Sequence, residues 1–276
     1  MGYGLLSPTF FEHNGKTLMI GIVPDKLSEA QNYQLGWAHT FSLPREISLS
    51  SDEKTILQKP YEGLEAMRST TTYSEQLTNY NLNGTKSLAP VSGRQFEVCG
   101  EFTIGSGNFG YNFYKNGSKM AKLYYDAGAD QIVVDFSSTD HWTQEEGDYF
   151  HGVYKSESLG LWNGNKIKIH LFVDHSIIDV FINDQYAFCV RMFVSDEDAN
   201  DVEVFSNGTT LVNSLQAWNI ENKTLTGINM IQTDDAIKEH QDEVKNNICY
   251  DLAGRRLNGK PQRGFYIMNG KKYVAR

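Results

Sequence analysis

The sequence predicts an all-β fold, and two observations lead to this prediction. Short runs of alternating, β-branched and aromatic residues recur along the chain, as expected of strands with one buried face. Asn-Gly pairs, which favour tight hairpin turns, punctuate the chain at residues 14–15, 83–84, 116–117, 163–164, 207–208, 258–259 and 269–270. Many short strands joined by such turns are typical of a β-sandwich or a β-propeller rather than of alternating strands and helices.

The strongest strand patterns group into one early strand and a later series. We expect strands at 16–23, 95–104, 110–115, 120–125, 131–136, 166–173, 176–183, 186–194 and 201–206. A short connecting helix is expected at 60–68, and a second helix at 233–245, where Thr233 is a possible N-cap. The polar stretch 69–88 is expected to form loops. These patterns divide the chain into 1–68, a sandwich at 75–222, a charged linker at 223–246 and a tail at 247–276.

Composition and charge bear on the partners of the chain. The 276 residues are 40% hydrophobic, enough to build a core. The net charge of −9 argues against nucleic acid or an anionic membrane as the main partner, because both need clustered positive charge. A neutral substrate such as a sugar fits this charge. The apolar run 18–23 is too short to span a bilayer, and residues 1–4 lack the charged start of a signal peptide.

The cysteine pattern predicts neither a zinc site nor any other metal site. Cys99, Cys189 and Cys249 are far apart, and no C-x-x-C pair is present. Cys99 and Cys189 lie in apolar runs, so we interpret them as small buried hydrophobic residues. No cofactor is expected either.

One string near the start of the chain resembles a known family signature. Residues 36–46 read Gly-Trp-Ala-His-Thr-Phe-Ser-Leu-Pro-Arg-Glu, and the expected strand 16–23 precedes them. This arrangement resembles the last blade of the propeller in glycoside hydrolase family 32, which includes invertases, inulinases and levanases. The resemblance implies a fold that begins with the terminal blade of a five-bladed β-propeller and continues into a C-terminal β-sandwich.

Further matches follow in the order that this family would require. Residues 171–184, with an Asp-x-Ser turn and the string Val-Phe-Ile-Asn, resemble the family's sandwich hairpin, and Phe96-Glu97-Val98 and 202–206 also fit. The resemblance implies a fructan or sucrose-type carbohydrate as substrate of the full-length enzyme, and a periplasmic or extracellular location for it. The strings 248–256 and 264–272 resemble the tails of many exported proteins of the Bacteroidetes.

The catalytic motifs that the resemblance implies do not occur in this sequence. Retaining glycosidases need two carboxylates about 5–5.5 Å apart, and the family carries its acidic residues in Asn-Asp-Pro, Arg-Asp-Pro and Glu-Cys motifs. None of these strings occurs here, and Glu97-Val98-Cys99 lies in the expected sandwich. We therefore assign no catalytic residue, and we expect this chain alone to be inactive.

Other candidate groups have ordinary structural interpretations. Glu145, Glu146 and Asp148 beside Trp142 are typical of a solvated loop. Asp174 and Asp179 flank a predicted hairpin turn; they could pair in space, although a turn-capping role for Asp174 is the more common case. We interpret His39 as structural, because no spacing supplies it with a partner, and Arg45 and Glu46 as anchors of the blade.

Trp37 is the only substrate-binding residue that we assign. In the family an aromatic residue of this string lies close to the fructose pocket, and an indole can stack on a sugar face and donate a hydrogen bond. A buried tryptophan that closes the blade is the alternative, and the sequence leaves both open. Gly2 stands where the family often has a fructose-contacting Asp.

Three hypotheses about function remain open at this point. The chain is the C-terminal part of a family 32-like β-fructosidase, a non-catalytic carbohydrate-binding module, or a structural subunit that pairs with a propeller-bearing partner chain. If the blade lacks its neighbours, Leu18, Ile20, Ile22 and Phe41 should lie on uncovered surfaces.

Overall fold

The computed structural model describes residues 5–24, 27–75, 77–141, 152–162 and 164–221, together with parts of the tail: 249–250, 256–257, 259, 261, 263–268 and 271–275. The chain divides into two compact units, Met1–Lys223 and Thr224–Arg276. Over these described residues the structure is all-β apart from one short α-helix and one 3-10 helix. Among the described residues, no helix has the length and apolar character needed to cross a membrane. The predicted helix at 233–245 lies outside the described residues.

The first unit begins with an antiparallel sheet, which we call the N-terminal sheet. Its strand order is β1-β2-β4-β5, with the short β3 also paired to β2. The strands are β1 (Leu6–His13), β2 (Lys16–Val23), β3 (Thr40–Phe41), β4 (Arg45–Leu49) and β5 (Ile56–Pro60). Helix α1 (Glu29–Leu35) lies between β2 and β3, capped at its start by Ser28, whose side chain accepts a hydrogen bond from the Gln31 N–H.

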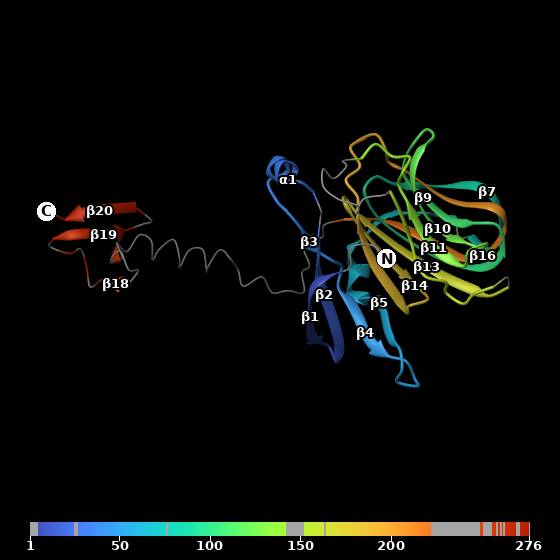
Figure 1. Cartoon of the computed structure of the whole chain (residues 1–276), viewed down its shortest axis with the longest axis horizontal. Coiled ribbons are helices and arrows are strands. Elements are labelled where there is room, and N and C mark those ends of the chain that lie inside the picture. Colours follow the sequence, from blue (N-terminus) through green and yellow to red (C-terminus); the bar gives the residue numbers. More distant parts are fainter. Residues whose placement is uncertain are drawn as a thin grey trace. The chain divides into compact units, whose positions relative to one another are not determined.

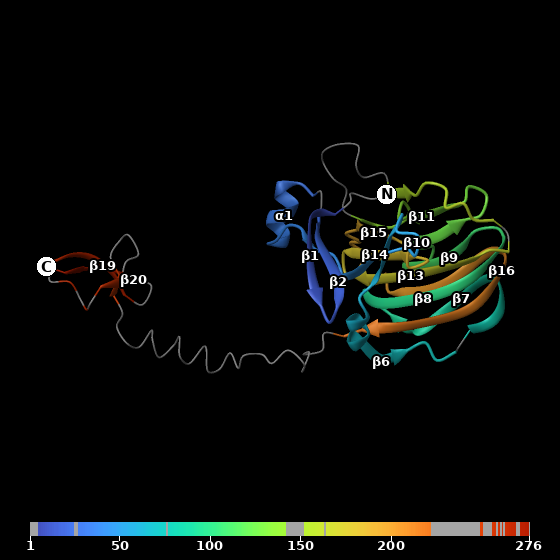
Figure 2. The ribbon, with the colours of Figure 1, turned by 90° about the horizontal axis from the view of Figure 1, so that it is seen from below.

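A 3-10 helix leads from the N-terminal sheet into the sandwich. It is η1 (Glu62–Met67), which confirms the short connecting helix expected at 60–68. Strand β6 (Arg68–Thr72) begins directly after it (Figure 2). The region 69–88, expected to be loops, instead contains most of β6 and much of β7 (Leu77–Ser92), so that prediction was wrong. Most side chains of β7 face solvent, and its pairing with β16 contains register shifts. Its sequence is therefore polar and lacks the alternation from which a strand is predicted.

The sandwich is one curled sheet of eleven strands whose two layers face each other. Its main order is β12-β11-β10-β9-β16-β8-β13-β14-β15, with β6 and β7 both paired to β16. The remaining strands are β8 (Gln95–Ser106), β9 (Phe109–Asn116), β10 (Lys119–Asp126), β11 (Gln131–Asp135), β12 (Val153–Lys155), β13 (Lys166–Asp174), β14 (Ile177–Ile182), β15 (Tyr186–Arg191) and β16 (Asp201–Ile220). Strand β16 is much longer than the expected 201–206, because it pairs with β6, β7, β8 and β9 along its length.

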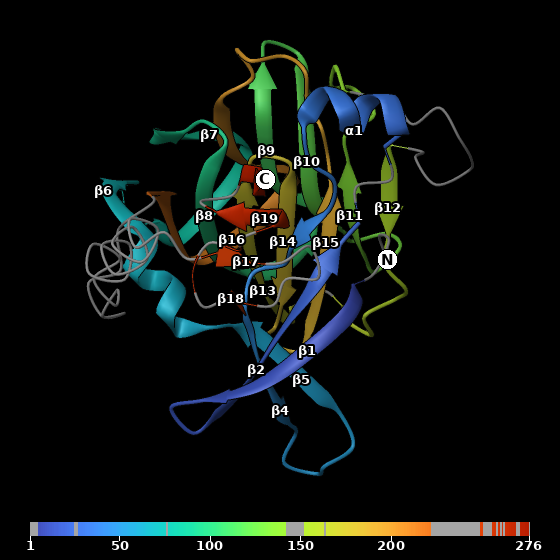
Figure 3. The ribbon, with the colours of Figure 1, turned by 90° about the vertical axis from the view of Figure 1, so that its left-hand side faces the viewer.

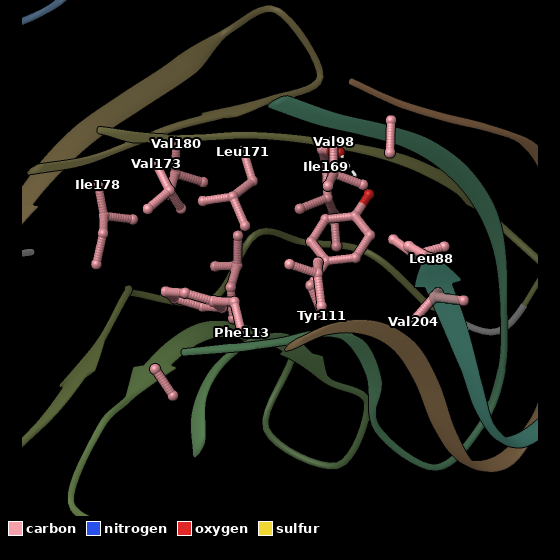
Figure 4. Packing of buried hydrophobic residues seen from close by; sticks show 14 of the residues in the cluster. Leu88, Val98, Tyr111, Phe113, Ile169, Leu171, Val173, Ile178, Val180 and Val204 are labelled. Carbon is pink, nitrogen blue, oxygen red and sulfur yellow. Dashed lines mark hydrogen bonds between the residues drawn. The ribbon is translucent and has the colours of Figure 1, made fainter. Parts of the chain in front are cut away.

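The sandwich core lies between these two layers. In Figure 4, Leu171 and Val173 of β13 lie opposite Tyr111 and Phe113 of β9. The hydroxyl of Tyr111 donates to the Ile169 carbonyl at 2.8 Å, which satisfies the one polar group of that ring inside the core. The alternating pattern seen in the sequence therefore corresponds to inward-facing residues of both layers.

The N-terminal sheet lies beside β14 and β15 of the sandwich (Figures 1 and 3). Strands β2 and β5 contact β15, and β5 also contacts β14. Leu18 is buried, with 2% of its surface exposed, so its predicted place on an uncovered surface was wrong. Phe41, in contrast, is exposed, and so is every residue of β1. The sandwich therefore contacts β2 and β5 of the N-terminal sheet, while the outer strand β1 is exposed to solvent.

The second unit contains a small antiparallel sheet in the tail. Its order is β18-β17-β19-β20, with β17 (Cys249–Tyr250), β18 (Arg256–Leu257), β19 (Gly264–Met268) and β20 (Lys271–Ala275). Cys249, Tyr266 and Met268 form its buried cluster. The division into four segments and the resemblance to exported tails stay predictions.

Candidate functional site

The carboxylates that the sequence placed in or near the sandwich serve as structural anchors. Asp174 accepts a hydrogen bond from the Gln95 side chain at 2.8 Å. Asp179 bonds to Arg45, and Glu97 bonds to Arg68 and His170. Asp174 and Asp179 therefore have different hydrogen-bond partners, although both border one small cavity of about 80 Å³. Trp142, Glu145, Glu146 and Asp148 lie outside the described residues.

A buried ion pair joins the N-terminal sheet to the sandwich. Arg45, the first residue of β4, places Nη2 at 2.9 Å from Oδ1 of Asp179 on β14, and both side chains are almost fully buried. Nη1 of Arg45 donates to Gln58 at 3.2 Å, and the Leu43 N–H donates to Oδ2 of Asp179 at 3.0 Å. The thiol of Cys189 donates to the same carboxylate. Arg45 therefore links the N-terminal sheet to the sandwich.

The pKa of the buried Asp179 carboxyl is raised above its ordinary value, although its neighbours oppose this rise. Burial raises the pKa of this carboxyl, while Arg45, Cys189 and the Leu43 N–H favour the ionised form. Glu46, the next residue of β4, points to different partners and forms ion pairs with Lys16 at 3.1 Å and Lys59 at 3.2 Å. Arg45 thus contacts the sandwich, whereas the adjacent Glu46 contacts lysines of its own sheet.

A second buried cluster lies where η1 meets the sandwich. Glu97 on β8 accepts from Nε and Nη2 of Arg68 at 2.8 and 2.7 Å, and Nε2 of His170 on β13 lies 2.7 Å from its Oε1. The Arg68 guanidinium also lies 3.8 Å from the centre of the Trp218 ring. A small cavity of about 180 Å³ borders this cluster, between Tyr61 and Leu64 on one side and β13 on the other.

His170 is held in its charged form at neutral pH. Burial works against the charge, but the neighbouring Cys99 and Glu97 outweigh it and raise the pKa of His170 to about 9. Burial also acts against the charge of Glu97, and the bonds from Arg68 and His170 outweigh it, so the pKa of Glu97 is lowered. The cluster is therefore a charged structural joint.

Trp37 lies at the edge of a cavity between the end of helix α1 and the sandwich. Trp37 is 46% exposed in this chain. The Arg191 guanidinium lies over two neighbouring rings, 5.1 Å from the centre of Trp37 and 4.8 Å from that of Phe193. The cavity measures about 390 Å³, and Arg94, His175, Ser176, Ser195 and Glu197 contribute its polar groups.

The remaining residues of the signature string do not add a reactive group. His39 is exposed and has a positive φ of 59°, a backbone conformation that is uncommon outside glycine. Within the described ranges, no group of three or more His, Cys, Asp or Glu side chains could hold a metal ion. Among the described residues that line the cavity beside Trp37, Glu197 is the one carboxylate.

The model of the C-terminal domain of family 32 glycosyl hydrolases matches residues 63–219. The chain belongs to glycoside hydrolase family 32. The matched residues include nearly all of η1 and of the curled sheet, so the sandwich is the C-terminal domain of this family.

Individual family members show the same relationship. The chain is 28% identical over 189 residues to a levanase of Bacillus subtilis (strain 168), covering 65% of this chain and 27% of that protein. It is 26% identical over 208 residues to a sucrose-6-phosphate hydrolase of Staphylococcus xylosus, covering 73% and 39%. The chain thus spans well under half of the length of these relatives.

A solved family structure shares the fold. Fructan 1-exohydrolase IIa from Cichorium intybus superimposes with a TM-score of 0.67 at 18% identity, covering 80% of this chain and 49% of that one. The family expectation and the all-β prediction with a C-terminal sandwich are therefore confirmed.

Sequence reasoning missed the joint formed by Arg68, Glu97 and His170. A signal was present, because Glu97 and His170 each interrupt a strongly apolar strand, and isolated charges in such strands are usually paired. Their pairing depends on the register of β8 against β13, in which Cys99 lies opposite His170. Sequence alone does not provide that register.

Proposed function

We propose that this chain is the C-terminal part of a β-fructosidase that cleaves fructans or sucrose. The observation that carries this proposal is Trp37, which is half exposed at the edge of a cavity and belongs to a string that resembles the family's last blade and precedes a family 32 sandwich. In this proposal the N-terminal sheet is the last blade of a five-bladed propeller. The catalytic carboxylates would come from a propeller segment, located either upstream in the same protein or in a partner chain.

Exposed apolar side chains on the N-terminal sheet support the blade assignment. Phe10 and Phe11 on β1 are 55% and 40% exposed, and Leu49 and Ile56, at the ends of β4 and β5, are also exposed. Neighbouring blades would cover such surfaces and recover about 25 cal/mol for each Å² of apolar area. They would also protect β1, whose outer edge is unpaired among the described residues.

Trp37 would contribute binding rather than bond cleavage. Its indole offers an aromatic face and one N–H donor, which suits a sugar ring with hydroxyls at its edge. Arg191 and Phe193 support the indole from the sandwich side, so the ring is held in place before substrate arrives. A periplasmic or extracellular location for the whole enzyme remains part of this proposal.

A fusion protein tests the proposal directly. The segment of the Bacillus subtilis levanase that precedes its matched region is joined to this chain, and release of reducing sugar from levan, inulin and sucrose is measured. We expect hydrolysis by the fusion and none by the chain alone. Trp37→Ala should lower kcat/KM by about 10- to 100-fold, the range expected for one lost stacking and hydrogen-bonding contact.

Trp162→Ala is the matched control, because Trp162 is also exposed, at 68%, but does not line the cavity beside Trp37. Its activity should equal that of the unmodified fusion. A fusion that unfolds cooperatively but hydrolyses none of the three substrates would overturn the proposed function. Full activity in Trp37→Ala would instead overturn the role of Trp37.

A further inference from the structure

The curled sheet brings its two edge strands, β12 and β15, to the same side of the sandwich. Within the described part of the chain, β12 pairs only with β11, and β15 pairs only with β14. The isolated bridge between His141 and Val194 joins the two sides at one point. Elsewhere the sides stay apart, and a cavity of about 390 Å³ lies between the start of β15 and the segment that follows β12.

The inner wall of this cavity is apolar and aromatic. Ile132 on β11 and Ile182 on β14 are buried beneath it, and Phe188 is packed against the sandwich core. Strand alternation places Tyr186 on the same face as Phe188, two residues away. Tyr186 remains 45% exposed, so its ring is available at the mouth.

The opposite wall is a short segment held firmly by hydrogen bonds. The Ser156 hydroxyl accepts from the Ile132 N–H at 2.9 Å and donates to the Glu157 carbonyl at 2.6 Å. Asp130 accepts from the Ser158 hydroxyl and from the Gly160 N–H. The cavity therefore has its shape before any ligand arrives, which reduces the entropy cost of binding.

Three polar groups around the mouth have no partner in the described protein. The Lys155 ammonium, the Glu157 carboxylate and the Tyr186 hydroxyl form no hydrogen bond or ion pair within the described ranges. All three border the same cavity. Together they place hydrogen-bond donors, hydrogen-bond acceptors and an aromatic ring face around one opening. The positive charge of Lys155 and the negative charge of Glu157 cancel.

We propose that this cavity is a saccharide-binding site for a neutral carbohydrate chain. A sugar ring would stack on Tyr186, Glu157 would accept hydrogen bonds from adjacent hydroxyls, and Lys155 would donate to a ring or hydroxyl oxygen. The cancelling charges give no preference for an anion or a cation. An apolar protein segment fits less well, because it would take Lys155 and Glu157 out of water without partners.

This site shares no lining residue with the cavity beside Trp37, and it needs no catalytic group. The inference rests on the proposed function and adds to it a second site that would hold the substrate polymer. Binding at this site can be measured without any cleavage. The test uses the full chain in native gels that contain levan, inulin or dextran, because a bound polymer slows migration. Levan and inulin are fructans and dextran is a glucan, so the three gels show which kind of polymer binds.

We expect slower migration in at least one polymer gel, and an apparent Kd raised about tenfold or more in Tyr186→Ala. Tyr186→Phe, which keeps the ring, should bind more tightly than Tyr186→Ala. Tyr80→Ala is the matched control, since Tyr80 is similarly exposed, at 40%, but lies on β7 away from the cavity.

Normal migration of the unmodified chain in all three gels would overturn the inference, and so would undiminished binding by Tyr186→Ala. Binding that is lost in Trp37→Ala but kept in Tyr186→Ala would also overturn it. That last result would leave the proposed function intact, because it would assign the sugar to the Trp37 cavity alone.

Discussion

Replacing Asp179 with Ala should destabilise the first unit by about 3–5 kcal/mol. The change leaves the Arg45 guanidinium buried without its 2.9 Å carboxylate partner, and it also removes the acceptor of the Leu43 N–H. An uncompensated buried charge is among the most costly defects that one substitution can create. Urea unfolding of the full chain, followed by tryptophan fluorescence, measures the change in the free energy of unfolding.

Two further variants separate the charge from the packing. Glu101→Ala breaks an ion pair of similar length, 2.8 Å to Lys166, but both side chains are well exposed, so the loss should stay below about 1 kcal/mol. The double variant Arg45→Met with Asp179→Leu removes both charges and keeps apolar volume, and it should be more stable than Asp179→Ala. Equal losses in Asp179→Ala and Glu101→Ala would show that the buried pair does not hold the two sheets together.

The stability of the first unit should fall as the pH rises from about 6.5 to about 9. His170 binds its proton more tightly when folded, with a pKa of about 9 against 6.5 for an unperturbed histidine. Its contribution is therefore fully present below pH 6.5 and is lost as the pH passes through 9. The difference corresponds to about 3 kcal/mol. Glu97, whose folded pKa is lowered, has the opposite dependence: its contribution is present above pH 4.5 and is lost in acid.

Urea unfolding at several pH values between 5 and 9.5 tests this dependence. His170→Gln keeps a donor toward Glu97 but does not titrate, so its free energy of unfolding should vary much less between pH 6.5 and 9. His13→Gln is the control, because His13 is exposed on β1 and should leave the profile unchanged. A profile that is as steep in His170→Gln as in the unmodified chain would show that other groups cause the loss of stability.

The sequence predicted much of the sandwich, and the reasons are physical. Strands such as 166–173 and 131–136 carry alternating or continuous apolar residues that both layers bury, so their pattern is strong. Strand β7 lacks this pattern because most of its side chains face solvent. Strand β1 was missed although it carries Phe10 and Phe11, because its exposed residues follow no clear alternation.

The candidate site was only partly predictable. The string 36–46 identified Trp37 and Arg45 as residues of interest, because a family signature marks them directly. Asp179 lies 134 residues from Arg45 along the chain, and their contact depends on how the N-terminal sheet lies on β14 and β15. The cavity at Tyr186 depends on how the sheet curls, and no local pattern in the sequence encodes that closure.

Hydrogen exchange of the full chain tests most directly whether the buried pair fastens the N-terminal sheet to the sandwich. In Asp179→Ala, the amides of β2 and β4 should exchange much faster than in the unmodified chain, while those of β13, which pairs on both sides, should stay protected. This result would show that the N-terminal sheet depends on the Arg45–Asp179 contact with the sandwich for its stability. Unchanged protection in β2 and β4, or an equal loss across β2, β4 and β13, would contradict it.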